Sequence, residues 1–291
     1  MIINRYMLTL FAALSSCAHR AAPPPSPGPV TFTIGNPYQA GGEWRYPREF
    51  NNYDVTGLST IIPDSVPRYT ANNELYDPEA LAAASPVLQL PCIVTITNLV
   101  TGQSVDVRVN DRGPMQSGRV IAVTPRVARL LDYPSGGVVE VEVKLNVAAT
   151  AALESSLGAG PKMSAAPVAS ITAQSLAAPG TTSGGSAMQQ LGPSANASQL
   201  NQSVTLSGTV SQGQPAPGPL WVQIAGFGAE SDAFRTMAKL YGMPARVVPV
   251  QGEDRTLWAV NVGPYHSVAD ADAALKQVLQ DGLAAPEIIV R

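Results

Sequence analysis

The sequence predicts a mainly β N-terminal domain, a small β-barrel, followed by a separate α+β domain with the order βαββαβ. Segments in which valines alternate with polar residues, divided by glycine and proline turns, predict the barrel. Residues 147–217 contain no aromatic residue, and Glu154 and Lys162 are their only charged residues, so they cannot build a core. We therefore expect a first domain at 37–146, a disordered linker at 147–217 and a second domain at 218–291.

The N-terminus is typical of an export signal that ends in a lipobox. A positive charge precedes the apolar run Met7–Leu14, which is too short to span a membrane. The pattern Leu14-Ser15-Ser16-Cys17 predicts a signal peptide at 1–16 and lipidation of Cys17; the alternative is an ordinary cleaved signal that contains a cysteine. Residues 17–36 would then form a lipidated, proline-rich tether, and Ala18 favours sorting to the outer membrane.

Charge and residue counts exclude several function classes. The net charge is −3 and no block of lysines or arginines stands out, so we expect no nucleic acid partner. No histidine lies between His19 and His266, which argues against a Ser-His-Asp triad or a histidine-ligated metal in the first domain. With Cys17 lipidated, Cys92 is expected to be a buried apolar residue. No metal or cofactor is expected.

The first domain divides into short strands and two short helices. Residues 94–99 and 105–109 flank the turn Thr101-Gly102-Gln103 and predict a hairpin, and the alternation over 139–145 predicts a final strand. Proline after a capping residue predicts helices over 77–84 and from Thr124 onward.

One strand of this domain ends on a candidate catalytic residue. Val105, Val107 and Val109 alternate with polar residues, and Gly113-Pro114 stops the strand pattern. Asp111 therefore lies where a rigid strand meets a turn. A carboxylate there is held still and can still reach a ligand.

The second domain is a doubled unit of strand, helix and strand. The expected strands are 221–225, 245–250, 257–262 and 287–290, and the expected helices are 231–241 and 267–279. Two helices on one face of such a sheet leave its other face open to a ligand.

Several blocks of the first domain occur in the order of a known family. They are 70–77, 80–84, 90–91, 94–99, 110–114 and 118–121. This order resembles the rare lipoprotein A family of septal-ring lytic transglycosylases, whose catalytic domain is a six-stranded double-psi β-barrel. The second domain resembles the sporulation-related repeat (SPOR) domain, which has a ferredoxin-like fold and binds glycan strands stripped of stem peptides.

The resemblance implies an activity and a location. The activity is endolytic cleavage of the bond between N-acetylmuramic acid and N-acetylglucosamine, which gives 1,6-anhydro products without a metal or nucleotide. The implied partners are peptidoglycan strands and divisome proteins, and we expect a monomer. The implied location is the periplasmic side of the outer membrane at the division septum.

The resemblance also implies roles for residues of the first domain. Asp111 matches the catalytic aspartate and Glu74 the acidic residue of the 70–77 block; Ser85 stands in place of a histidine and Ala122 in place of a second aspartate. The alternatives are that Asp111 caps its own turn and pairs with Arg112, and that Glu74 is a solvated loop residue. We expect Arg112 to orient a carboxylate or a sugar and Ser85 to lie in the substrate groove, while Tyr76 either stacks on a sugar or fills the core.

Candidate ligand residues of the second domain are Gln223, Phe227 and Trp258. Gln223 and Phe227 belong to a block similar to that of the SPOR family, and Gln223 and Trp258 are expected on the open face of the sheet. The alternative is that Trp221 and Trp258 fill the core beneath the helices. Strand parity in the sequence does not decide between the two.

Three functions compete for this chain. The first is a lytic transglycosylase, and the second is a non-catalytic, expansin-like glycan binder, favoured by Ser85 and Ala122. The third is a structural septal lipoprotein that recruits partners through its linker.

Overall fold

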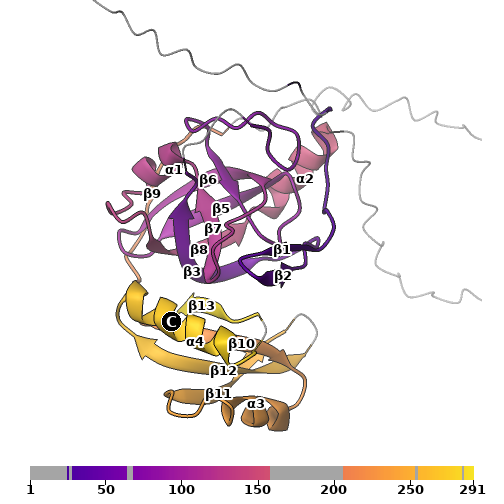
Figure 1. The fold of residues 1–291 in the computed structure, drawn as a ribbon. Coiled ribbons are helices and arrows are strands. Elements are labelled where there is room, and N and C mark those ends of the chain that lie inside the picture. Colours follow the sequence, from indigo (N-terminus) through magenta and orange to yellow (C-terminus); the bar gives the residue numbers. More distant parts are fainter. Residues whose placement is uncertain (1–24, 26–27, 64–67, 158–205, 253–254, 284) are drawn as a thin grey trace, which may run out of the picture.

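The computed structural model describes residues 25, 28–63, 68–157, 206–252, 255–283 and 285–291. They form a barrel domain and a smaller C-terminal domain packed beneath it in Figure 1. The predicted signal peptide, Cys17 and residues 158–205 of the predicted linker lie outside the described residues.

Six strands close into a barrel, as expected. They are β3 (Asp54–Ile61), β4 (Ala82–Ala84), β5 (Cys92–Asn98), β6 (Gln103–Asp111), β7 (Arg119–Val123) and β8 (Val139–Leu145). Their order is β4-β7-β3-β8-β5-β6, and parallel pairing of β4 with β6 closes the ring. The pair β3–β7 is also parallel, and the remaining neighbours in the ring are antiparallel.

The predicted hairpin and final strand are confirmed by β5, β6 and β8. Val105, Val107 and Val109 are buried in one core cluster, while Asp106 and Arg108 lie between them on the opposite face of β6. Cys92 belongs to the same cluster and is fully buried, as expected, and this burial raises the pKa of its thiol.

One of the two predicted helices of this domain is correct. Helix α1 (Pro125–Leu130) begins after Thr124, as expected. The helix expected over 77–84 is wrong, because Ala82–Ala84 form strand β4 between β6 and β7. Backbone pairing on two sides outweighs the helix propensity of the alanines.

The barrel domain extends beyond both of its expected boundaries. Thr33, expected in the tether, pairs with Leu90, and the hairpin of β1 (Tyr38–Ala40) and β2 (Glu43–Arg45) follows. The start of the expected linker forms helix α2 (Val147–Ser156), in which Asn146 caps the N-terminus and Leu153 is buried. Its other end forms strand β9 (Ser211–Gln212), which pairs with β6. Backbone pairing and the burial of Leu153 hold these segments on the barrel, although the segments contain few large apolar residues.

The C-terminal domain has the predicted βαββαβ order. Its elements are β10 (Leu220–Phe227), α3 (Glu230–Met237), β11 (Ala245–Gln251), β12 (Thr256–Tyr265), α4 (Val268–Gln280) and β13 (Glu287–Val290). The strands lie in the order β11-β12-β10-β13, all antiparallel. Residues of both helices share one apolar cluster with alternate strand residues, so both helices cover the same face of the sheet.

The two domains dock through α4 and β13, which face the barrel in Figure 1. The guanidinium of Arg119 on β7 makes two bonds of 2.7 and 2.8 Å to Asp272 on α4. The Thr56 hydroxyl donates to the Val290 carbonyl (2.7 Å) and accepts from its N–H (3.3 Å), which covers part of the edge of β13. Leu58 of the barrel lies in the apolar cluster of the C-terminal domain.

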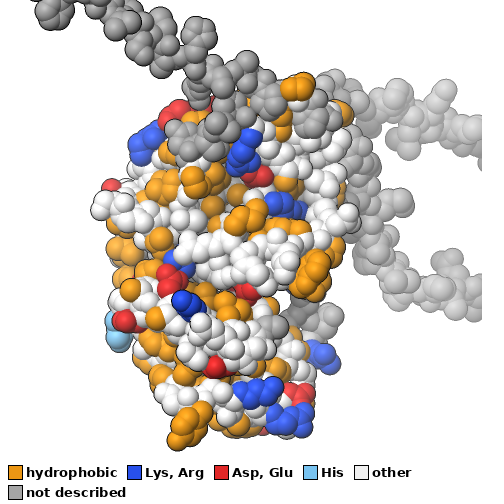
Figure 2. Space-filling model, in the orientation of Figure 1, with side chains coloured by type: hydrophobic (Ala, Val, Ile, Leu, Met, Phe, Trp, Pro, Cys, Tyr) orange, Lys and Arg blue, Asp and Glu red, His pale blue; other side chains and the backbone are white. Residues whose placement is uncertain are grey.

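The surface in Figure 2 carries acidic and basic side chains interspersed with polar and apolar ones. Within the described residues, no helix is long and apolar enough to cross a membrane.

We predict that Asp272→Asn weakens the docking of the two domains. The Arg119 side chain is only 2% exposed and would lose its counter-charge, which should cost about 1–3 kcal/mol of unfolding free energy. Urea denaturation measures the loss, and small-angle scattering should show a larger radius of gyration. Asp281→Asn, at the exposed end of α4, is the control, and equal behaviour of the two variants would contradict the prediction.

Candidate active site at the end of strand β6

Three donors hold the Asp111 carboxylate in place. Its Oδ1 accepts the backbone N–H groups of Ala71 and Arg112, both at 2.9 Å, and its Oδ2 lies 2.7 Å from Nη1 of Arg68. The side chain is 8% exposed. The carboxylate is therefore fixed, and among the described residues Oδ2 has fewer partners than Oδ1.

The backbone of Asp111 joins the barrel closure directly. Asp111 pairs with Ala84 of β4, and its carbonyl accepts the N–H of Ser85 at 3.0 Å. Gly113 follows with a φ of 139°, a conformation that a residue with a side chain rarely adopts. The strand-to-turn junction predicted from the sequence is thus present, and the barrel closure fixes it.

Glu74 lies in a dense hydrogen-bond network. Its Oε1 accepts from Nε (2.9 Å) and Nη2 (2.6 Å) of Arg108 and from Nδ2 of Asn72 (2.7 Å), and its Oε2 accepts from Nδ2 of Asn110 (2.8 Å). Burial acts to raise the pKa of Glu74, but the hydrogen bonds from Arg108, Asn110 and Asn72 outweigh it and lower the pKa. Glu74 is therefore an ionised, positioned carboxylate and not a solvated loop residue.

The loop 68–76 brings the two predicted carboxylates to one end of β6. Ala71 of this loop binds Asp111, and Glu74 binds Arg108 and Asn110, which are neighbours of Asp111 on β6. Alternation on β6 could have identified Arg108 and Asn110 as partners, because they share its polar face.

Arg68 was not expected from the sequence as a partner of Asp111. Its guanidinium also lies 4.8 Å from the ring centre of Tyr76. Tyr76 is buried in a small cluster with Ala84 and Ala122, so it is placed as the core aromatic that was one of its two expected roles.

The guanidinium of Arg112 does not bind the Asp111 carboxylate, to which Arg112 donates its backbone N–H. Its Nη1 donates to the carbonyls of Ser85 (3.3 Å) and Leu88 (2.6 Å), and its Nη2 donates to the carbonyl of Ile34. Burial lowers the pKa of Arg112, and nearby Tyr38 counteracts this effect. Arg112 therefore clamps the turn after β4 to the N-terminal segment.

Ser85 is enclosed by its own turn. Its hydroxyl accepts the N–H groups of Val87 (3.4 Å) and Leu88 (3.3 Å), and the residue is 1% exposed. The structure thus places Ser85 beside Asp111 through its backbone, with its side chain engaged in the turn.

The open face of the C-terminal sheet carries Gln223 but not Trp258. Gln223 donates to Oδ1 of Asn261 at 2.8 Å. Trp258 alternates in step with Val260 and packs against the helix-facing cluster, so its expected place on the open face is wrong. A bulge before Phe227, with Gly226 at a φ of 97°, places Phe227 opposite Trp258 on that same helix-facing side.

The buried aromatic of the open face is Trp221. It has the same parity as Gln223 on β10, and the Arg246 guanidinium lies 4.0 Å from the ring centre. Each of the two alternatives is thus partly correct. Gln223 lies on the open face, Trp258 packs in the core beneath the helices, and Trp221 does not lie in that core. Among the described residues, no group of three or more His, Cys, Asp or Glu side chains is arranged to hold a metal ion.

Comparisons with known proteins match both domains. Residues 55–143 match the lytic transglycolase family, and residues 216–288 match the SPOR domain. The chain is 33% identical over 207 residues to the endolytic peptidoglycan transglycosylase RlpA of Yersinia pestis, which covers 68% of this chain and 54% of that protein.

Two further relatives carry the same name. The chain is 28% identical over 314 residues to RlpA of Escherichia coli strain K12, covering 87% of this chain and 82% of that protein. It is 39% identical over 126 residues to RlpA of Pseudomonas aeruginosa strain UCBPP-PA14, covering 43% and 36% of the two chains. The match thus spans about half the length of the Yersinia relative and about four fifths of the Escherichia relative.

The lowered pKa of Glu74 predicts a specific acid sensitivity. Because this pKa is lower in the folded than in the unfolded chain, the stabilisation is complete above the unfolded value of about 4.3 and is lost as the pH falls through the folded value. The unfolding free energy of the wild type should therefore fall more steeply between about pH 5 and pH 3 than that of Glu74→Gln, which cannot ionise.

Urea denaturation across this pH range measures the difference in slope. Glu79→Gln is the matched control, because Glu79 is an exposed partner of Arg129 on the same domain. If Glu74→Gln and Glu79→Gln follow the wild-type slope equally, the stabilising role of the Glu74 network is refuted.

Proposed function

Since the chain belongs to the rare lipoprotein A family, with a double-psi β-barrel and a SPOR domain, we propose that it is a peptidoglycan lytic transglycosylase. The observation that carries the proposal is the Asp111 carboxylate, held at the end of β6 inside the segment that matches the lytic transglycolase family. Relatives named as endolytic peptidoglycan transglycosylases support the reaction class.

The proposed reaction needs one group that moves a proton in two directions. A carboxylic acid protonates the glycosidic oxygen, which leaves C1 of N-acetylmuramic acid together with N-acetylglucosamine. The resulting carboxylate then takes the proton of the C6 hydroxyl of N-acetylmuramic acid as this hydroxyl bonds to C1. Oδ1 of Asp111 accepts two backbone N–H groups, whereas Oδ2 has Arg68 as its single partner within the described residues. We therefore assign the proton transfer to Oδ2.

Glu74 would act through its charge and not as a proton donor. Hydrogen bonds from Arg108, Asn110 and Asn72 favour its ionised form. An ionised carboxylate beside the scissile bond stabilises the positive charge that develops on the sugar ring in the transition state.

The proposed substrate is glycan that lacks stem peptides, cut within the strand during daughter-cell separation. The SPOR match supports binding of peptidoglycan by the C-terminal domain. The lipobox supports anchoring through Cys17 to the periplasmic side of the outer membrane. Divisome proteins are the proposed partners at the septum, and the acting species is a monomer.

A second candidate function is glycan binding without cleavage. It is favoured by the low exposure of Asp111, by the engagement of the Ser85 hydroxyl in its own turn, and by the apolar setting of Ala122. Such a protein would hold a glycan strand in the same place and leave it uncut.

We predict that Asp111→Asn lowers the rate of glycan cleavage by about 10²–10⁴-fold, because the amide cannot transfer a proton. The full chain is incubated with peptidoglycan lacking stem peptides, and 1,6-anhydro products are quantified by mass spectrometry. Asp106→Asn is the matched control on the same strand; its carboxylate accepts from the Thr95 hydroxyl at 2.6 Å, away from the site.

The two candidate functions give different results in this assay. Products from the wild type and from Asp106→Asn, but not from Asp111→Asn, support cleavage by Asp111. If the wild type binds glycan but yields no products, the enzyme proposal is refuted and the glycan-binding function is supported.

A further inference from the structure

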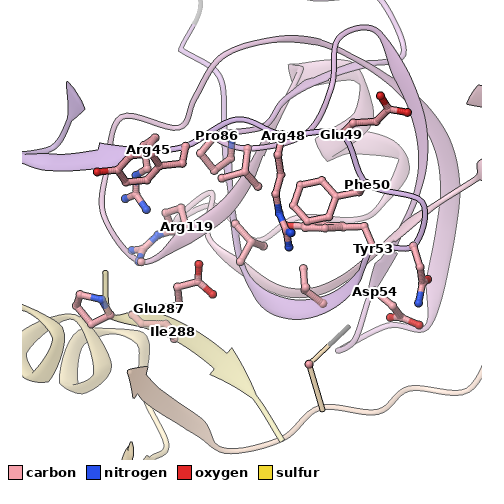
Figure 3. A pocket seen from close by; sticks show the side chains of 18 of the residues that line it. Arg45, Arg48, Glu49, Phe50, Tyr53, Asp54, Pro86, Arg119, Glu287 and Ile288 are labelled. Atoms are coloured by element: carbon pink, nitrogen blue, oxygen red, sulfur yellow. The ribbon is translucent and has the colours of Figure 1, made fainter. Parts of the chain in front are cut away.

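A cavity of about 1000 Å³ lies between the barrel and the C-terminal domain (Figure 3). The barrel lines it with residues 45–46 and 48–55, with the turn at Pro86 and Val87, and with residues 118–120. The C-terminal domain lines it with residues 251–252 and 286–288. Asp111 and Glu74 are not among its lining residues, so it is separate from the candidate active site.

Arg45 and Arg119 line the cavity, and each has one enclosed nitrogen without a hydrogen-bond partner within the described residues. In both residues this nitrogen is Nε. The remaining guanidinium atoms of Arg119 bind Asp272, and Nη2 of Arg45 binds Glu43 at 2.7 Å. Both Nε atoms are themselves enclosed by protein, so the two guanidinium groups act on a ligand through their positive charge and not through a hydrogen bond from Nε.

Glu287 supplies an acceptor from the opposite wall. Its side chain projects from β13 toward the barrel residues in Figure 3, and it makes no ion pair within the described part of the chain. Water reaches it inside the cavity, but protein surrounds it, and this burial raises the pKa of Glu287 while Arg45 counteracts the rise. A ligand hydroxyl or amide N–H would satisfy this carboxyl group.

Aromatic rings complete the barrel wall. The Arg48 guanidinium lies 4.3 Å from the centre of the Phe50 ring, and Phe50 meets Tyr53 edge to face with ring centres 5.0 Å apart. Tyr46 is 63% exposed and is the ring that a ligand reaches most easily. Such rings offer flat apolar surfaces beside the polar groups.

These groups together select one class of ligand. Guanidinium groups on one wall and the Glu287 carboxyl group on the other suit a ligand with polar groups of both kinds, and the presence of both charge signs disfavours a strongly anionic or cationic molecule. The aromatic surfaces add an apolar component, and the volume is at the upper end of the range for ligand pockets. A hydroxyl- and amide-rich oligosaccharide meets all of these requirements.

The cavity also borders the candidate active site through one turn. Arg112, next to Asp111, binds the carbonyls of Ser85 and Leu88, while the Val87 carbonyl accepts the N–H of Arg48 in the cavity wall. We propose that the cavity between the domains is a second saccharide site, which, building on the proposed function, holds the part of the glycan strand that extends beyond Asp111.

Hydrogen exchange tests this site in the full chain that carries Asp111→Asn, so that no cleavage occurs. The probe is purified peptidoglycan glycan lacking stem peptides. Residues 45–55 and 286–288 should exchange more slowly when the glycan is bound. Protection confined to residues 68–76, residues 108–114 and the open face of the C-terminal sheet would overturn the proposal.

Tyr46→Ala should weaken glycan binding by about threefold to tenfold, because a stacking surface is lost. Glu287→Ala, on the other wall, should weaken it as well. Tyr241→Ala is the matched control, because Tyr241 is 99% exposed and does not line the cavity. Equal affinity of Tyr46→Ala and Tyr241→Ala would refute the site.

The outcome is separable from that of the proposed activity. A wild-type chain that yields no 1,6-anhydro products but shows glycan-dependent protection at residues 45–55 would overturn the enzyme proposal and support the saccharide site. Cleavage by the wild type without glycan-dependent protection at residues 45–55 would support the enzyme proposal and overturn the saccharide site.

Discussion

Parallel pairing of β4 with β6 is the contact on which the rest of the barrel domain depends. Strand β4 contains only Ala82–Ala84, and its backbone pairs with β6 on one side and with β7 on the other. Closure at this place sets Asp111 against Ala84 and fixes the end of β6. The loop 68–76, which precedes β4, then folds over that end and delivers Ala71 and Glu74 to their partners. A fixed ring therefore holds both carboxylates.

Sequence patterns identified the features that have a local cause. Valine alternation predicted β6 and β8, the Thr124-Pro125 pair predicted α1, and the strand-to-turn junction singled out Asp111. Features with a distant cause were missed. Ala82–Ala84 form a strand because of pairing, Arg68 meets Asp111 across the fold, and the bulge at Gly226 shifts residue parity on β10. Such effects arise between segments far apart in the chain.

Arginine guanidinium groups stabilise the places where separate segments meet, although only 13% of the residues of this chain are charged. Arg108 binds Glu74, Arg68 binds Asp111, Arg112 clamps the turn after β4, and Arg119 joins the two domains. A planar guanidinium makes several hydrogen bonds of fixed direction, which suits it to places where backbone segments converge. Because each guanidinium binds different groups, replacing one should disturb one of these places and leave the others intact.

The short strand β9 changes how far the C-terminal domain can move. Since Ser211 and Gln212 are hydrogen-bonded to the start of β6, only residues 213–219 connect this anchor to β10. A fully extended connection of that length reaches roughly 25 Å. After undocking, the C-terminal domain would thus stay close to the barrel at a high effective concentration, and redocking would be an intramolecular event. A ligand held by one domain would therefore stay within reach of the other.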